Sequence, residues 1–156
     1  MTQNSTTQIR RVVSAILMNE QGTVLLQQRD NADLKPDLPY PGYWTFFGGA
    51  VEPGEEPGDA IRRELLEELE IEAVLKFWQS YQCPARTIPG EVVTINYVYI
   101  GRLDRDLATM TLHEGQKMDY FSQSASTALE LAFMQSPVLA NFFEQRRILF
   151  NEADDE

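Results

Sequence analysis

The sequence contains a single cysteine, Cys83, and a single histidine, His113. One cysteine excludes an intramolecular disulfide, which agrees with a reducing compartment. A catalytic thiol would need a basic partner to form the thiolate, and no motif joins Cys83 to the histidine. We therefore expect Cys83 to be buried or chemically inert.

Long apolar runs are also absent. No run approaches the roughly 18–20 residues that a membrane-spanning helix needs. Residues 1–9 are polar and lack the apolar stretch of a signal peptide. We therefore expect a cytoplasmic protein that does not act at a membrane.

Positive charge is scarce: 13 lysines and arginines face 24 aspartates and glutamates, and the net charge is −11. Such a surface repels the backbone of a nucleic acid, so a polymer partner is not expected. A small anionic substrate can still bind where a divalent metal reverses the local field. The sequence therefore favours a small-molecule partner over a nucleic acid.

The 156 residues fit one domain, which we place at 10–150, between a flexible N-terminus at 1–9 and an acidic tail at 151–156. Apolar and β-branched runs predict strands, and runs rich in Leu, Glu, Arg and Ala predict helices. The order of these elements predicts a mixed α/β sheet covered by helices. The predicted strands are 10–18, 23–28, 43–47, 73–82, 91–103 and 119–122, the predicted helices are 57–70, 124–133 and 137–149, and 29–43 is a long loop.

One predicted helix carries three carboxylates on a single stripe. Glu64, Glu67 and Glu68 are spaced i, i+3, i+4, so they share one side of the helix. Magnesium prefers hard oxygen ligands, and three carboxylates on a rigid helix form a platform for it. The alternative is a solvated acidic face, which is common on exposed helices. The Gly48-Gly49 turn just upstream favours the metal site, because glycine permits close backbone approach and its carbonyl can bind a metal.

The segment from Gly49 to Ile71, GAVEPGEEPGDAIRRELLEELEI, resembles the Nudix box. That motif specifies a glycine, a glutamate after five residues, and an Arg-Glu-hydrophobic-any-Glu-Glu-any-Gly-hydrophobic run after seven more. Eight of the nine specified positions agree. Glu70 is the exception, since it stands where the family has a glycine that suits the left-handed end of a helix.

The resemblance implies an α/β/α sandwich with a mixed β-sheet, in which metal-activated water hydrolyses a diphosphate bond. It implies Mg²⁺ as cofactor, with Mn²⁺ as a substitute. Its expected ligands are Glu64, Glu67, Glu68 and the carbonyl of Gly48. Arg63 would orient these glutamates, and Gly49 and Glu55 would brace the box. The expected catalytic residues are Glu67, Glu68, Arg63 and Glu114.

We include Glu114 among the catalytic candidates because the segment around His113 to Ser122 looks like the late loop of MutT-type members. That loop can supply another acidic residue. The alternative interpretation of Glu114 is an ordinary surface glutamate of a loop. Glu91 is a weaker candidate for the same catalytic role. Trp44 and Phe46 are candidates for contacting the substrate, with core packing as their alternative. The protein would be a monomer or a homodimer.

The MutT-like features favour a nucleoside triphosphate, in ordinary or oxidised form, cleaved to the monophosphate and pyrophosphate. ADP-ribose and nucleotide sugars remain alternative substrates. A catalytically silent domain that senses a nucleotide is the alternative function.

Overall fold

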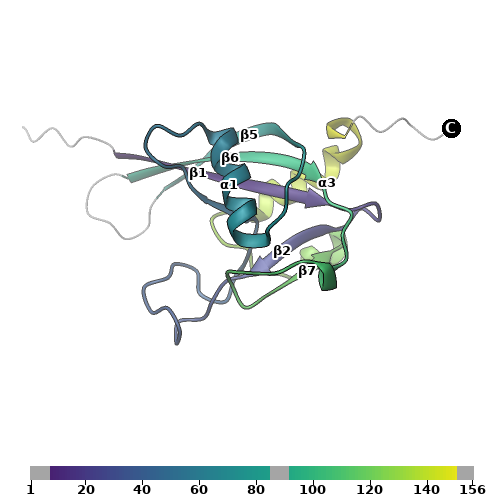
Figure 1. Ribbon diagram of the computed structural model, residues 1–156, viewed down its shortest axis with the longest axis horizontal. Helices are drawn as coiled ribbons and strands as arrows, with labels where there is room; N and C mark the ends of the chain where they lie inside the picture. Colours follow the sequence, from purple (N-terminus) through teal and green to yellow (C-terminus); the bar gives the residue numbers. More distant parts are fainter. Residues whose placement is uncertain (1–7, 85–91, 151–156) are drawn as a thin grey trace, which may run out of the picture.

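The computed structural model describes residues 8–84 and 92–150 (Figure 1). Glu91, residues 1–7 of the predicted N-terminus at 1–9, and the predicted tail at 151–156 lie outside these ranges. In chain order the elements are β1 (Gln8–Met18), β2 (Val24–Gln28), β3 (Trp44–Thr45), β4 (Phe47–Ala50), α1 (Pro57–Leu69), β5 (Leu75–Pro84), β6 (Val92–Arg102), the 3₁₀ turn η1 (Leu107–Thr109), β7 (Lys117–Phe121), α2 (Gln123–Ser126) and α3 (Gln135–Leu149).

The strands form one mixed sheet, as the sequence predicts. Its order is β3-β2-β1-β6-β5, with β4 paired to β1 and β7 paired to β2. The central pair, β1 with β6, is parallel, and the other pairings are antiparallel. The antiparallel partner of β1 changes along its length: Met18 pairs with β2, whereas Val12 to Ala15 pair with β4.

Helices cover both faces of the sheet, with α1 across one face and α3 across the other (Figure 1). The α1 core contains Ile61, Leu65 and Leu69, whose full burial contributes about 1.5–3 kcal/mol each. The α3 core contains four buried apolar residues of that helix, Val138, Leu139, Phe142 and Phe143. The α/β/α arrangement is therefore confirmed. No helix in the described ranges is long and apolar enough to cross a membrane.

The chain between β7 and α3 differs from the prediction. A helix was expected over 124–133, but α2 ends at Ser126. The next helix begins at Gln135, because Phe133 and Met134 have φ of 55° and 58° and cannot continue a right-handed helix. Left-handed backbone at two non-glycine residues costs about 1–2 kcal/mol each. Tertiary contacts of this segment with β3 override its helical pattern: Ala132 N–H donates to Trp44 O at 2.9 Å.

Helix α1 ends where the glycine of the motif is missing. Glu70 takes the left-handed conformation that a glycine would take, with φ 56° and ψ 37°, and its N–H donates to Leu66 O at 3.1 Å. Its carboxylate pairs with His113 Nε2 at 2.5 Å on the surface. An exposed pair of this kind contributes at most about 1 kcal/mol. Glutamate therefore preserves the helix exit at a conformational cost.

Glu70→Gly is expected to raise the free energy of unfolding by about 0.5–1 kcal/mol, because glycine removes the left-handed penalty. Arg62→Gly is the control, since Arg62 lies exposed within α1 and glycine there should destabilise by about 1 kcal/mol. Urea denaturation of both variants measures the difference. A destabilised Glu70→Gly protein would show that the His113 pair outweighs the backbone strain.

Candidate active site

Arg63 joins the loop after β4 to the acidic side of α1. Its Nε donates to Glu55 Oε2 at 2.8 Å and its Nη2 to Ala50 O at 3.0 Å. Its Nη1 lies 3.1 Å from Glu64 Oε1 and 3.2 Å from Glu67 Oε2. The structure therefore brings these predicted residues together around one guanidinium, whose planar fork suits several carboxylates at once.

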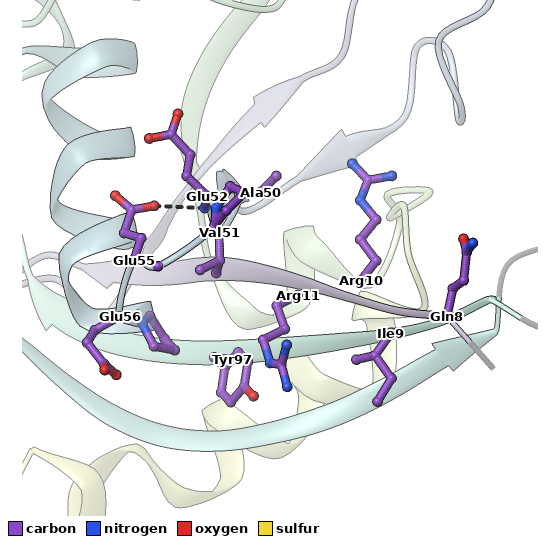
Figure 2. Close-up of a pocket in the computed structure, with 13 residues that line it drawn as sticks. Gln8, Ile9, Arg10, Arg11, Ala50, Val51, Glu52, Glu55, Glu56 and Tyr97 are labelled. Atoms are coloured by element: carbon purple, nitrogen blue, oxygen red, sulfur yellow. Dashed lines mark hydrogen bonds between the residues drawn. The ribbon is translucent and has the colours of Figure 1, made fainter. Parts of the chain in front are cut away.

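Glu55 braces the loop as well as pairing with Arg63. Its Oε1 accepts from the backbone N–H of Glu52 at 2.9 Å, the dashed contact in Figure 2. The hydrogen bond from Arg63, and then that from Glu52, lower the pKa of Glu55 to about 2. Glu55 is thus ionised near neutral pH and accepts these hydrogen bonds as a carboxylate.

Glu68 is the buried carboxylate of the site. Glu68 is only 3% exposed, and its Oε1 accepts a hydrogen bond from Gln27 Nε2 at 3.0 Å. Oε2 is the one buried side-chain polar atom in the described residues that has no hydrogen-bond partner. Burial raises the pKa of Glu68 to about 9. A buried, unpaired carboxylate oxygen is costly unless a proton or a cation completes it.

Glu64 lies against the Gly48-Gly49 turn. A Cβ built on Gly49 would lie 2.4 Å from Glu64 Oε1, so the glycine leaves the space that this carboxylate occupies. Burial raises the pKa of Glu64 despite the neighbouring Arg63. Gly48 approaches β1 even more closely, since a Cβ there would lie 1.9 Å from Val13 O. Gly48 is therefore required by close packing against backbone, whereas Gly49 leaves room for the end of the Glu64 side chain.

These residues fit a divalent cation by their chemistry. No three Asp, Glu, His or Cys side chains in residues 8–84 and 92–150 converge as a ready-made cage. Arg63 instead holds Glu64 and Glu67, and Glu68 Oε2 is unpartnered. A hard cation would supply the missing partner of Glu68 and compete with the guanidinium for the other two carboxylates.

The loop after η1 delivers Glu114 to the same site. His113 N–H donates to Glu68 O at 2.9 Å, and Gln116 N–H donates to Gln28 O at 2.8 Å. Between them Gly115 has φ 85°, and a Cβ there would lie 2.7 Å from Gln28 O. The loop is therefore fixed to both α1 and β2. Glu114, exposed at the surface, and buried Glu68 line one cavity.

That cavity has a volume of about 770 Å³ and lies between the box and the 29–43 loop. It is lined by Gly48, Gly49, Glu68 and Glu114, and also by three cationic side chains, Arg10, Arg29 and Lys35. Burial lowers the pKa of Arg29, and Lys35 pairs with Asp30 at 2.8 Å. The site thus places carboxylates and cations around one space, which suits a polyanion bound together with metal.

Trp44 and Phe46 differ in their placement. Phe46 lines this cavity although it is 3% exposed and belongs to the core. Trp44 is not among the lining residues; its ring packs edge-on against Phe121, with centroids 4.8 Å apart. Sequence reasoning did not assign a role to Arg29 or to Gln135, which also line the cavity. Arg29 directly follows the predicted second strand at 23–28, but no sequence signal marks Gln135.

A second cavity, of about 800 Å³, lies beside the box loop and is shown in Figure 2. It is lined by β1 residues, by the loop 50–57 and by Tyr97. Arg10 and Arg11 leave opposite sides of β1 there (Figure 2). None of the helix glutamates or Glu114 lines it. Of the predicted acidic residues, Glu68 and Glu114 line the first cavity, whereas Glu64 and Glu67 are among the lining residues of neither.

Cys83 also lines the first cavity and is buried, with 8% exposure. It forms no disulfide. Its burial agrees with the expectation drawn from the sequence.

Comparison with known proteins agrees with this geometry. The model of the NUDIX domain family matches residues 8–142. The CTP pyrophosphohydrolase of Escherichia coli is 32% identical over 136 residues, which cover 86% of this chain and 92% of that protein. The nucleoside triphosphatase NudI of Escherichia fergusonii is 36% identical over 67 residues, 43% of this chain and 44% of that protein.

Solved structures share the fold. The solution structure of the E. coli ORF135 protein is 30% identical and covers 96% of both chains, with a TM-score of 0.67. The dihydroneopterin triphosphate pyrophosphohydrolase of E. coli is 20% identical, covers 92% of this chain and 99% of its own, and has a TM-score of 0.69.

Proposed function

The chain belongs to the NUDIX domain family and is a Nudix hydrolase, and from this we propose that it cleaves a nucleoside triphosphate to the monophosphate and pyrophosphate with Mg²⁺. The observation that carries the proposal is the unpartnered Oε2 of Glu68, which is buried at a cavity that cationic side chains also line. Relatives whose names describe nucleotide hydrolysis support the substrate class.

Glu64, Glu67 and Glu68, with the carbonyl of Gly48, are the groups that would hold Mg²⁺, and Mn²⁺ should substitute for it. When bound, the metal neutralises phosphate charge and makes water a better nucleophile. Arg63 orients these carboxylates through the contacts already described. The helix residues therefore serve chiefly to bind and position.

The remaining roles fall to residues around the cavity. Arg29 and Lys35 bind phosphate oxygens, which offsets the repulsion that a chain of charge −11 exerts on a polyanion. Glu114 accepts the proton of the attacking water, because it lies on a loop fixed beside Glu68. The water oxygen forms a bond to phosphorus, and the bond from that phosphorus to the bridging oxygen breaks.

A hydrolysis panel tests the proposal. Purified protein is incubated with canonical and oxidised nucleoside triphosphates, ADP-ribose, nucleotide sugars and dinucleoside polyphosphates in Mg²⁺, and products are separated by chromatography. We expect one or more triphosphates to yield monophosphate and pyrophosphate, with turnover lost in EDTA and restored by Mg²⁺ or Mn²⁺. Release of orthophosphate instead would show cleavage at the other phosphate bridge.

Turnover of ADP-ribose or a nucleotide sugar alone would replace the proposed substrate. No turnover, with magnesium still raising the melting temperature, would favour the nucleotide sensor. Sedimentation of the same preparation distinguishes a monomer from the homodimer that the sequence also allows.

A further inference from the structure

Glu70 is the one specified position of the box that departs from the motif. It takes the left-handed conformation that glycine adopts freely, with φ 56° and ψ 37°. Its hydrogen bond to Leu66 O comes from the backbone N–H, so any residue could make it. Strain at a non-glycine residue persists where other contacts hold it, and it concentrates at functional sites. Whatever offsets the strain at Glu70 therefore lies in its side chain.

The Glu70 side chain orients the ring of His113. Glu70 Oε2 lies 2.5 Å from His113 Nε2. A carboxylate oxygen accepts, so Nε2 is the ring nitrogen that carries the hydrogen in this contact. Both side chains are exposed, and an exposed pair adds little to stability. The contact therefore matters more for where it holds His113 than for the stability of the fold.

His113 is attached to the end of α1 at two points. Its backbone N–H donates to Glu68 O at 2.9 Å, and its ring contacts Glu70. A single hydrogen bond leaves a residue free to rotate about it, whereas a second contact fixes the orientation as well. Glu114 follows His113 directly, so the direction of the Glu114 side chain depends on that orientation.

The other side of Glu114 is attached to β2. Gly115 is left-handed, with φ 85°, and turns the chain back toward the sheet. Gln116 N–H then donates to Gln28 O, and Gln116 Nε2 donates to Arg29 O, both at 2.8 Å. Glu114 is thus the tip of a short segment, 113–116, that is held at both ends. The α1 end of this segment takes its orientation from one exposed side-chain contact.

The position of this tip matters for the chemistry. Glu114 and Glu68 line the first cavity, whereas Glu70 is not among its lining residues. A reacting group that is misplaced by about 1 Å loses about 10²-fold in rate. A contact outside the cavity can therefore act on the reaction by controlling where Glu114 lies.

We infer that Glu70 is a positioning residue for hydrolysis: through His113 it orients the segment 113–116, so that the Glu114 carboxylate stays at the cavity beside Glu68. The inference rests on the function proposed above and deepens it. It gives the residue that replaces the motif glycine a task, which is to orient the group that accepts the proton of water.

The kinetic test compares Glu70→Gly, which restores the motif residue, with Glu70→Gln, which keeps an acceptor of the same length. Hydrolysis of CTP, UTP, GTP and ATP is measured in Mg²⁺, and the fastest substrate of wild type is followed. We expect Glu70→Gly to lower kcat about 3- to 10-fold and to change KM less than about 2-fold, although its urea midpoint rises. Glu70→Gln should keep kcat within about 2-fold of wild type. A merely structural role would move stability and kcat in the same direction.

Two controls separate positioning from charge. Glu72→Gln removes the same charge from an exposed glutamate two residues further on, and should change kcat less than about 2-fold. His113→Ala should lower kcat as Glu70→Gly does. Because both substitutions break one contact, combining them should slow kcat less than about 2-fold further.

Amide exchange reads the attachment without turnover. In EDTA, NMR follows the His113 N–H, which donates to Glu68 O, and the Gln116 N–H, which donates to Gln28 O. Glu70→Gly should speed exchange at His113 about 3- to 10-fold and change Gln116 less than about 2-fold.

Unchanged exchange at His113, or unchanged kcat, in Glu70→Gly would overturn the inference. Equal losses of kcat in Glu70→Gln and Glu72→Gln would also overturn it, because charge alone would then explain the effect. Failure of the proposed function is a separate result, in which wild type cleaves no triphosphate. The exchange measurement still decides in that case whether Glu70 orients the segment.

Discussion

Glu68→Gln is expected to lower hydrolysis by about 10²–10³-fold and to make the metal-free protein more stable. The activity falls because an amide is a weaker ligand than a carboxylate for a hard cation. The stability rises because the wild-type carboxyl is buried beside Glu64 with one oxygen unpartnered. Removing that ionisable group should add about 1–3 kcal/mol to the free energy of unfolding near pH 7.

The gain should depend on pH in a defined direction. The pKa of Glu68 rises from 4.5 to about 9 on folding, so the folded state binds the extra proton between these values. The contribution of Glu68 to wild-type stability is therefore fully present below pH 4.5 and is lost as pH rises toward 9. The difference between Glu68→Gln and wild type should widen over the same window.

Denaturant titrations in EDTA at several pH values measure this difference, and hydrolysis in Mg²⁺ measures the activity. Glu67→Gln is the control, since the Glu67 side chain is 57% exposed. That variant should lose activity with a stability change within about 0.5 kcal/mol. A Glu68→Gln protein less stable than wild type at pH 8 would show that the Gln27 contact outweighs the cost of burial.

The sequence predicted the parts of the site that lie on regular structure. Glu64, Glu67 and Glu68 share a helix face because 3.6 residues make a turn, and this periodicity is visible in one chain. The burial of Glu68 was not predictable in the same way. It depends on Gln27, which lies 41 residues earlier and meets Glu68 only once β2 packs beside α1.

The cavity beyond the box depends on tertiary contacts even more. The helical pattern of 124–133 failed because Trp44 pairs with this segment and the chain turns left-handed at Phe133. Gln135 enters the cavity as a result of that turn. Trp44 was a substrate candidate for its aromatic ring alone, and its ring packs on Phe121 instead. Composition cannot tell which side of a short strand faces the cavity.

The neighbouring substitutions Gly48→Ala and Gly49→Ala are expected to impair different properties. The first should lower stability, and the second should lower hydrolysis. At Gly48 the added methyl would lie 1.9 Å from Val13 O, a backbone atom of the sheet. Since β1 cannot move without breaking its pairing with β4 and β6, Gly48→Ala should destabilise by about 3 kcal/mol. Its melting temperature should fall clearly, with or without metal.

At Gly49 the methyl would meet the carboxylate of Glu64, the mobile end of a side chain. Gly49→Ala should therefore cost less than about 1 kcal/mol, because Glu64 can move aside. The displaced carboxylate leaves the position proposed for metal binding, so hydrolysis should fall about 10²-fold. Thermal denaturation in EDTA and turnover in Mg²⁺ separate the two effects. Full activity in Gly49→Ala would mean that Glu64 does not need its place against the glycine turn, and Glu67 with Glu68 would then be left as the carboxylates that hold the metal.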